Sequence, residues 1–186
     1  MWRKITWVLA LFISAPLFAK ETDLRLYRPF TETNQQVPLT LSANLVGQCS
    51  AQSALIKRDD AWRCQVDHKI YDPCFVAPFG SHLKALCIAS PWSTEGIEIT
   101  VSMPLDNSLH ETLDMSRTYP WGIQLTNGEM CHAILPYAEY DGLPARYLCD
   151  GHSTLIGHLQ RCQNTWKILQ HTLSGVETVA IDRAWF

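Results

Sequence analysis

The chain has 186 residues, and its 47% hydrophobic content is that of a globular domain, while its formal net charge at pH 7 is only −3. A slightly acidic chain does not suit nucleic acid, whose phosphates require a basic stripe that displaces counterions. It also lacks the polybasic cluster that attracts proteins to anionic lipid.

The first 19 residues have the pattern of a secretory signal peptide. Arg3 and Lys4 form a short positive region, an apolar run covers 5–18, and the small residue Ala19 marks the expected cleavage site. Because the apolar run is shorter than the roughly 20 residues that cross a bilayer, an uncleaved membrane anchor is the less favoured alternative. Cleavage leaves 13 basic and 18 acidic residues, a net charge of −5 with histidine neutral. We therefore expect a periplasmic or secreted protein that is soluble after signal cleavage.

The rest of the chain favours strands and turns. Residues 20–38 are polar without periodicity, which predicts a flexible leader, and 39–186 suit a single domain, divisible into lobes at 39–103 and 119–186. The segment 104–118 predicts either a short helix or a linking loop. Strands are expected in the first lobe at 39–46, 62–66, 84–89 and 97–103. The fold class predicted is mainly β, or α+β with few helical residues: a small, disulfide-stapled antiparallel sheet or barrel-like domain.

Seven cysteines follow the signal, and in an exported protein they predict a disulfide framework. Many connectivities are open. Local spacing favours Cys49–Cys64, Cys74–Cys87 and Cys131–Cys149, at separations of 15, 13 and 18 residues. Loops of that size each stabilise a fold by ~3 kcal/mol in the chain-entropy model. Cys162 is then a free thiol, expected to be buried, with an intermolecular disulfide and a redox site as alternatives.

The segment 121–135 predicts a hairpin around Asn127-Gly128, a pair suited to a two-residue type I′ turn. That turn sets Ile123 opposite His132. The face expected to pack on the core then carries Trp121, Ile123, Leu125, Met130, His132 and Ile134. Cys131 would lie on the other face, near Cys149 on a neighbouring strand, 145–149. A second hairpin is expected from 166–173 and 176–185, turning at Ser174-Gly175.

Motifs that carry chemistry are scarce. The chain has no Gly-x-Ser-x-Gly elbow, phosphate-binding loop, dinucleotide fingerprint or His-Glu-x-x-His helix. A metal site from Cys149, His152 and His158, beside Cys131-His132, has the wrong spacing for one helical face or a zinc finger. A cysteine nucleophile would use Cys162, with His158 or His171 as base and Asp182 as orienting residue. We predict no catalytic residue, no metal site and no cofactor.

Aromatic residues supply the candidate binding surface. Five tryptophans follow the signal, and core packing explains them better than a ligand platform does. The loop 138–144 contains the turn residues Asp141-Gly142 and is flanked by tyrosines. A recognition surface is therefore expected there, formed by Tyr137, Tyr140, Asp141 and Tyr147.

Several short runs together resemble a pattern found in uncharacterised exported bacterial cysteine-rich proteins. The runs are Asp60-Ala-Trp-Arg-Cys64, Tyr71-Asp-Pro-Cys-Phe75, Pro91-Trp92, Pro120-Trp121-Gly-Ile-Gln-Leu-x-Asn-Gly-x-x-Cys131, Tyr147-x-Cys149, Leu155-x-Gly157 and Ala184-Trp185. The resemblance covers about residues 45–186, with Cys162 outside the shared cysteine pattern. It implies no activity and no catalytic residue.

Two functions therefore stand as hypotheses. The favoured one is an exported, non-enzymatic binding or interaction module whose partner is a protein or an envelope component, acting as an accessory to an envelope or secretion machine or in host interaction. The alternative is a small envelope hydrolase or thiol enzyme.

Overall fold

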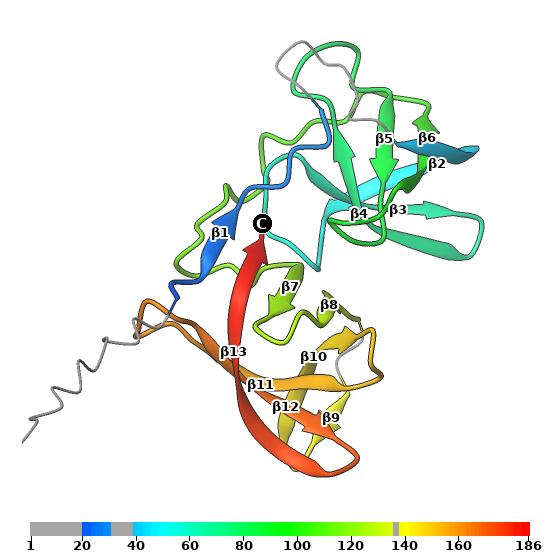
Figure 1. The fold of residues 1–186 in the computed structure, drawn as a ribbon. Helices are drawn as coiled ribbons and strands as arrows, with labels where there is room; N and C mark the ends of the chain where they lie inside the picture. The colour runs from blue at the N-terminus through cyan, green and yellow to red at the C-terminus, as the bar shows by residue number, and fades with distance from the viewer. Residues whose placement is uncertain (1–19, 31–38, 136–137) are drawn as a thin grey trace, which may run out of the picture.

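The computed structural model describes residues 20–30, 39–135 and 138–186, and its regular secondary structure is entirely β-strand (Figure 1). The predicted mainly β class is therefore confirmed. Between the two sheets, residues 104–118 form turns and loop, which settles the choice left open for that segment. Residues 1–19, the expected signal peptide, lie outside the described residues.

Five strands form a closed barrel in the first half of the chain. They are β2 (Thr40–Gln52), β3 (Ala61–Val66), β4 (Lys69–Val76), β5 (Lys84–Cys87) and β6 (Glu95–Val101). Each strand runs antiparallel to the next one along the chain. An odd number of alternating strands brings the first and last into the same direction, so the closing pair, β2 with β6, is parallel.

A second sheet of eight strands closes through the C-terminal strand. Its members are β1 (Asp23–Arg25), β7 (Gly122–Leu125), β8 (Met130–Ala133), β9 (Glu139–Tyr140), β10 (Leu143–Cys149), β11 (Thr154–Gln160), β12 (Lys167–Thr172) and β13 (Gly175–Trp185). The first part of β13 pairs with β12, and its last part pairs with β7. The long, curved β13 therefore joins the two ends of the sheet, as Figure 1 shows in red.

The expected flexible leader is wrong for residues 20–30. There β1 runs parallel to the end of β13, and the buried Thr22 donates a hydrogen bond from its hydroxyl to the carbonyl of Ile181 at 2.7 Å. Main-chain pairing at a sheet edge holds this segment, and such pairing leaves no hydrophobic periodicity to detect. Residues 31–38 lie outside the described part of the chain.

The two barrels share one hydrophobic core. The ring of Trp121, at the start of the second barrel, lies 5.7 Å from Phe75 of the first barrel and 5.3 Å from Tyr27. The backbone of Gly122 also lies close to the side chain of Pro91, since a Cβ at Gly122 would lie 2.5 Å from Cγ of Pro91. The barrels therefore form one packed unit, while the interior of the first barrel holds a separate smaller cluster.

Arg58 connects three parts of the chain at this junction. Its side chain is 6% exposed and forms a bidentate ion pair with the carboxylate of Asp60, with N–O distances of 2.8 and 2.5 Å. It also donates to the main-chain oxygens of Tyr27 and Phe186. Asp59 and Asp60 form a turn, and Asp60 pairs there with a buried arginine.

The register of the Asn127-Gly128 hairpin differs by one residue from the prediction. Ile123 lies opposite Cys131, not His132, because only Gly128 adopts a positive φ (91°) while the type I′ turn requires two such residues. The resulting three-residue connection moves every β8 side chain to the other face. Cys131 is therefore buried in the core, and Met130 and His132 are only half-buried.

The three expected disulfides are present, and each joins residues that lie directly opposite each other on neighbouring antiparallel strands. Cys162 is the free cysteine of the described residues, but it is exposed rather than buried. It lies in the connection between β11 and β12, outside both hydrophobic clusters. The predicted buried thiol is therefore wrong.

Candidate functional site

A β-bulge between β3 and β4 creates the polar centre of the candidate site. Cα pairing runs from Trp62–Cys74 to Cys64–Tyr71, so Arg63 alone faces two residues, Asp72 and Pro73. Proline lacks the N–H that a regular ladder requires, and a bulge is one of the few places where a strand accepts it. Bulges also redirect side chains, and this one brings Arg63 and Asp72 to the wall of a groove.

The groove has a volume of about 470 Å³ and lies where the first barrel meets the end of β8. Its lining residues are Ala54, Leu55, Arg63, Ile70, Asp72 and Leu135. Ile70 and Leu135 are 49% and 38% exposed, so apolar surface is open to solvent on two sides of the polar pair. A concave apolar surface with a few converging polar groups is the usual form of a ligand site.

The Asp72 carboxylate is held in place from the β2–β3 connection. One oxygen accepts the hydroxyl hydrogen of Ser53 at 2.5 Å, and the other accepts the main-chain N–H of Ala54 at 3.0 Å. Ser53 is fully buried and its oxygen also accepts the N–H groups of Leu55 and Ile56. Burial raises the pKa of Asp72 above its ordinary value, and the hydrogen bonds from Ser53 and Ala54 oppose that effect.

Arg63 is half-buried, and within the described part of the chain its guanidinium has no hydrogen-bond or ion-pair partner. Its charge acts on Asp72 at a distance rather than through contact. A guanidinium has five N–H donors in a planar fork. The groove therefore presents unmatched donors beside apolar walls.

A pH prediction follows from the raised pKa of Asp72. The folded protein holds the Asp72 proton more tightly than the unfolded chain does. Protonated Asp72 therefore stabilises the fold below its ordinary pKa of 3.8. This stabilisation is lost as the pH rises through the raised pKa of the folded state. We expect the free energy of unfolding of the wild type, relative to Asp72→Asn, to fall as pH rises above 3.8. Urea unfolding of both proteins over a series of pH values measures this difference in the free energy of unfolding. A difference that stays constant or grows with pH would contradict the assignment.

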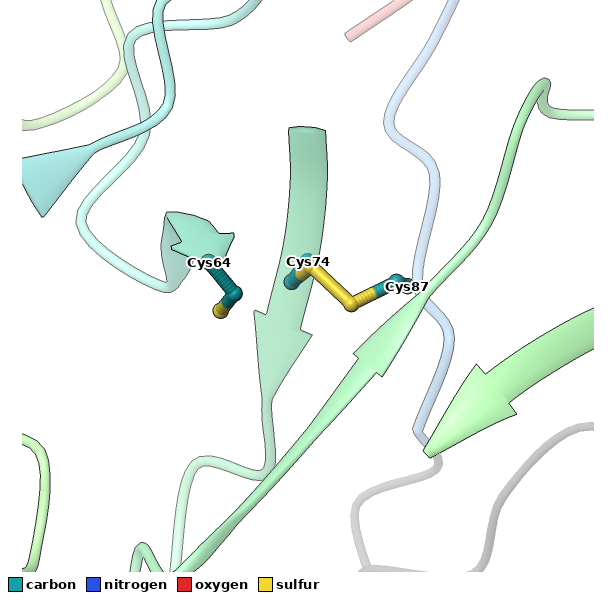
Figure 2. A group of neighbouring side chains, drawn as sticks. All are labelled: Cys64, Cys74 and Cys87. Atoms are coloured by element: carbon teal, nitrogen blue, oxygen red, sulfur yellow. A yellow bond between two sulfur atoms is a disulfide. The ribbon is translucent and has the colours of Figure 1, made fainter. Parts of the chain in front are cut away.

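A second cluster consists of sulfur atoms inside the first barrel. The Sγ atoms of Cys64, Cys74 and Cys87 lie within 4.8 Å of one another, and all three residues are buried (Figure 2). Metal binding by cysteine requires thiolates. Cys74 and Cys87 are bonded to each other and Cys64 to Cys49, so the cluster has no thiolate to offer while both disulfides are intact.

The predicted aromatic surface is not assembled as expected. Tyr140 and Asp141 are exposed at the β9–β10 turn, and Tyr140 packs on the ring of His171 at 4.5 Å. Tyr147 is 1% exposed and donates its hydroxyl hydrogen to the carbonyl of Pro120. The prediction that it belongs to a binding surface is therefore wrong. It occupies an inward position of β10, and strand alternation buries it. Tyr137 lies outside the described residues.

Among the described residues, the side chains proposed for a cysteine nucleophile do not form a group within 4.8 Å of one another. His158 shares a hydrogen bond with the Tyr119 hydroxyl, and Asp182 pairs with Lys20. In the same way Cys149, proposed as a metal ligand, is bonded to Cys131. The residues of the groove were not predicted from the sequence. The one signal for them is Asp72-Pro73, a pair with the composition of a turn that lies inside β4.

Comparison with protein-family models, with curated proteins and with solved structures finds no match. Within the described ranges, no helix has the length and apolar character that would let it cross a membrane. The three disulfides are consistent with an exported protein in an oxidising compartment.

Proposed function

We propose that this chain is an exported, non-enzymatic module that binds a partner protein through the groove around Asp72 and Arg63. The observation that carries the proposal is the half-buried Arg63, whose N–H donors are unmatched within the described residues and face a groove with apolar walls. A hydrogen bond to a charged group contributes roughly 1.5–3 kcal/mol once its acceptor is in place. A bound ligand would supply that acceptor.

The chemistry of the groove specifies the partner segment. It carries an acceptor oxygen, from a main-chain carbonyl or a carboxylate, to meet Arg63. It also carries an apolar side chain that packs against Leu55, Ile70 and Leu135. Asp72 is the single carboxyl among the lining residues, and its hydrogen bonds to Ser53 and Ala54 favour an orienting role over proton transfer.

Export to the periplasm or beyond the cell is part of the proposal. The amino-terminal pattern of residues 1–19 and the three disulfides support it. We also propose a relationship to the uncharacterised exported cysteine-rich bacterial proteins. Within the shared pattern, Cys64, Cys74 and Trp121 are buried, which fits a resemblance in fold rather than in activity.

Site-specific crosslinking in cells that express the protein tests the function. A photoreactive amino acid at Ile70 or Leu135 is expected to capture one dominant protein, and the same amino acid at Leu173, exposed at the β12–β13 turn, is expected not to capture it. Equal capture from all three positions, or none from the groove, would contradict the proposal.

The captured partner then allows a direct measurement. In a purified system, Arg63→Ala is expected to weaken the partner's affinity about 10-fold to 100-fold, because a hydrogen bond to a charged group contributes roughly 1.5–3 kcal/mol. Lys57→Ala, which removes an exposed positive charge outside the groove, is the matched control and should leave the affinity unchanged. Equal losses in both variants would show that the contact is not made at Arg63.

A further inference from the structure

Two of the three disulfides lie side by side inside the first barrel. Cys49–Cys64 joins β2 to β3, and Cys74–Cys87 joins β4 to β5. Because β3 and β4 are neighbours, the Sγ atom of Cys64 faces the second disulfide and lies within 4.8 Å of both its sulfur atoms (Figure 2). Cys131–Cys149 belongs to the other hydrophobic cluster and has no such neighbour among the described cysteines.

Of the two cysteines in the first of these disulfides, only Cys49 is partly exposed. Cys49 is half-buried and is one of the residues that line a cavity of about 320 Å³ at the end of the barrel, together with Trp62, Met103 and Leu105. Cys64 is 1% exposed. A thiol that enters this cavity therefore lies next to Cys49, while Cys64 is buried within the barrel.

We propose that the two disulfides form a thiol–disulfide exchange relay that accepts an external thiol at Cys49. The thiolate of the incoming molecule attacks Sγ of Cys49, forms a mixed disulfide there and displaces Cys64 as a thiolate. The Cys64 thiolate attacks Cys74 or Cys87, forms a new disulfide with that residue and releases the other as a thiolate, which takes a proton from solvent. Each step breaks one S–S bond and forms one, so the relay needs no oxidant or reductant.

The proposal is independent of the Asp72 groove and adds a modification site to the molecule. After the exchange, the protein carries the incoming thiol on Cys49 and still has a disulfide that links β3 to β4 or β5. The exposed Cys162 takes no part, because it lies outside the barrel that contains the cluster. The ligand is defined by its chemistry: a thiol, on a small molecule or on a protein.

A variant tests the internal step without any added thiol. In a Cys162→Ser background, Cys49→Ser leaves Cys64 unpaired beside Cys74–Cys87. Alkylation at low pH followed by tryptic mapping separates these cysteines, since Arg63, Lys69 and Lys84 lie between them. We expect peptides in which Cys64 is bridged to Cys74 or Cys87, with the displaced cysteine alkylated. The matched control, Cys149→Ser in the same background, leaves Cys131 unpaired but isolated, and its two other disulfides should be unchanged.

Alkylation of Cys64 alone, with Cys74–Cys87 intact, would overturn the relay. A second measurement does not depend on the Cys49→Ser variant folding. The Cys162→Ser protein is incubated with glutathione, and we expect one glutathione on Cys49 together with a bridge from Cys64 to Cys74 or Cys87. No adduct, or an adduct with the Cys74–Cys87 disulfide unchanged, would also overturn it. The same incubation with a cysteine-containing protein in place of glutathione shows whether the cavity admits a protein thiol.

Discussion

Replacing Arg58 with alanine is expected to lower the free energy of unfolding by about 3–5 kcal/mol. Its side chain is almost fully buried and pairs with Asp60 through two short contacts. The substitution leaves that carboxylate without its partner and removes a donor from the main-chain oxygens of Tyr27 and Phe186. The guanidinium also lies over the ring of Phe75, so packing is lost in addition to charge.

Urea unfolding with the disulfides intact measures this change. The control is the adjacent residue: Lys57 is 46% exposed and lies 4.0 Å from Glu111, an exposed pair. Lys57→Ala is expected to change stability by no more than about 1 kcal/mol, because exposed ion pairs contribute little. If the two alanine variants were equally stable, Arg58 would not be the connection between the N-terminal segment, the C-terminal strand and the first barrel.

Removing the disulfide of the second barrel is expected to lower the free energy of unfolding by about 2–5 kcal/mol. The double variant Cys131→Ala/Cys149→Ala frees a loop of 18 residues in the unfolded chain and deletes two sulfur atoms from the shared core. Both cysteines are almost fully buried, so the surrounding side chains lose packing contacts as well.

The matched cysteine substitution is Cys162→Ser. Its side chain is exposed and outside both cores, so we expect a stability change within about 0.5 kcal/mol. Unfolding is followed without reductant, to keep the remaining disulfides intact. A double variant as stable as Cys162→Ser would show that this disulfide does not stabilise the fold.

The groove and the exchange relay are separable by experiment. Arg63→Ala changes the groove and leaves all six bonded cysteines in place, while Cys49→Ser changes the relay without removing a groove residue. A variant of each kind therefore shows whether partner binding and thiol exchange are independent properties of the protein.

Local patterns in the sequence were sufficient for the fold class and for the pairing of the cysteines. In a barrel whose strands follow one another along the chain, neighbouring strands are also close in sequence. The three disulfides join such neighbours, so pairings between cysteines that are near each other in the sequence were correct. The Asn127-Gly128 hairpin was likewise visible in the sequence, because turn residues act locally.

Register, burial and the site depended on contacts between distant segments. The hairpin turn admits two connections that differ by one residue, and packing of Cys131 into the core selects one of them. Asp72-Pro73 has the composition of a turn, but its pairing opposite Arg63 makes it a bulge inside a strand. The groove needs Leu135 from the end of β8, far from Asp72 along the chain. No local pattern specifies that meeting, because it arises only when the two barrels pack against each other.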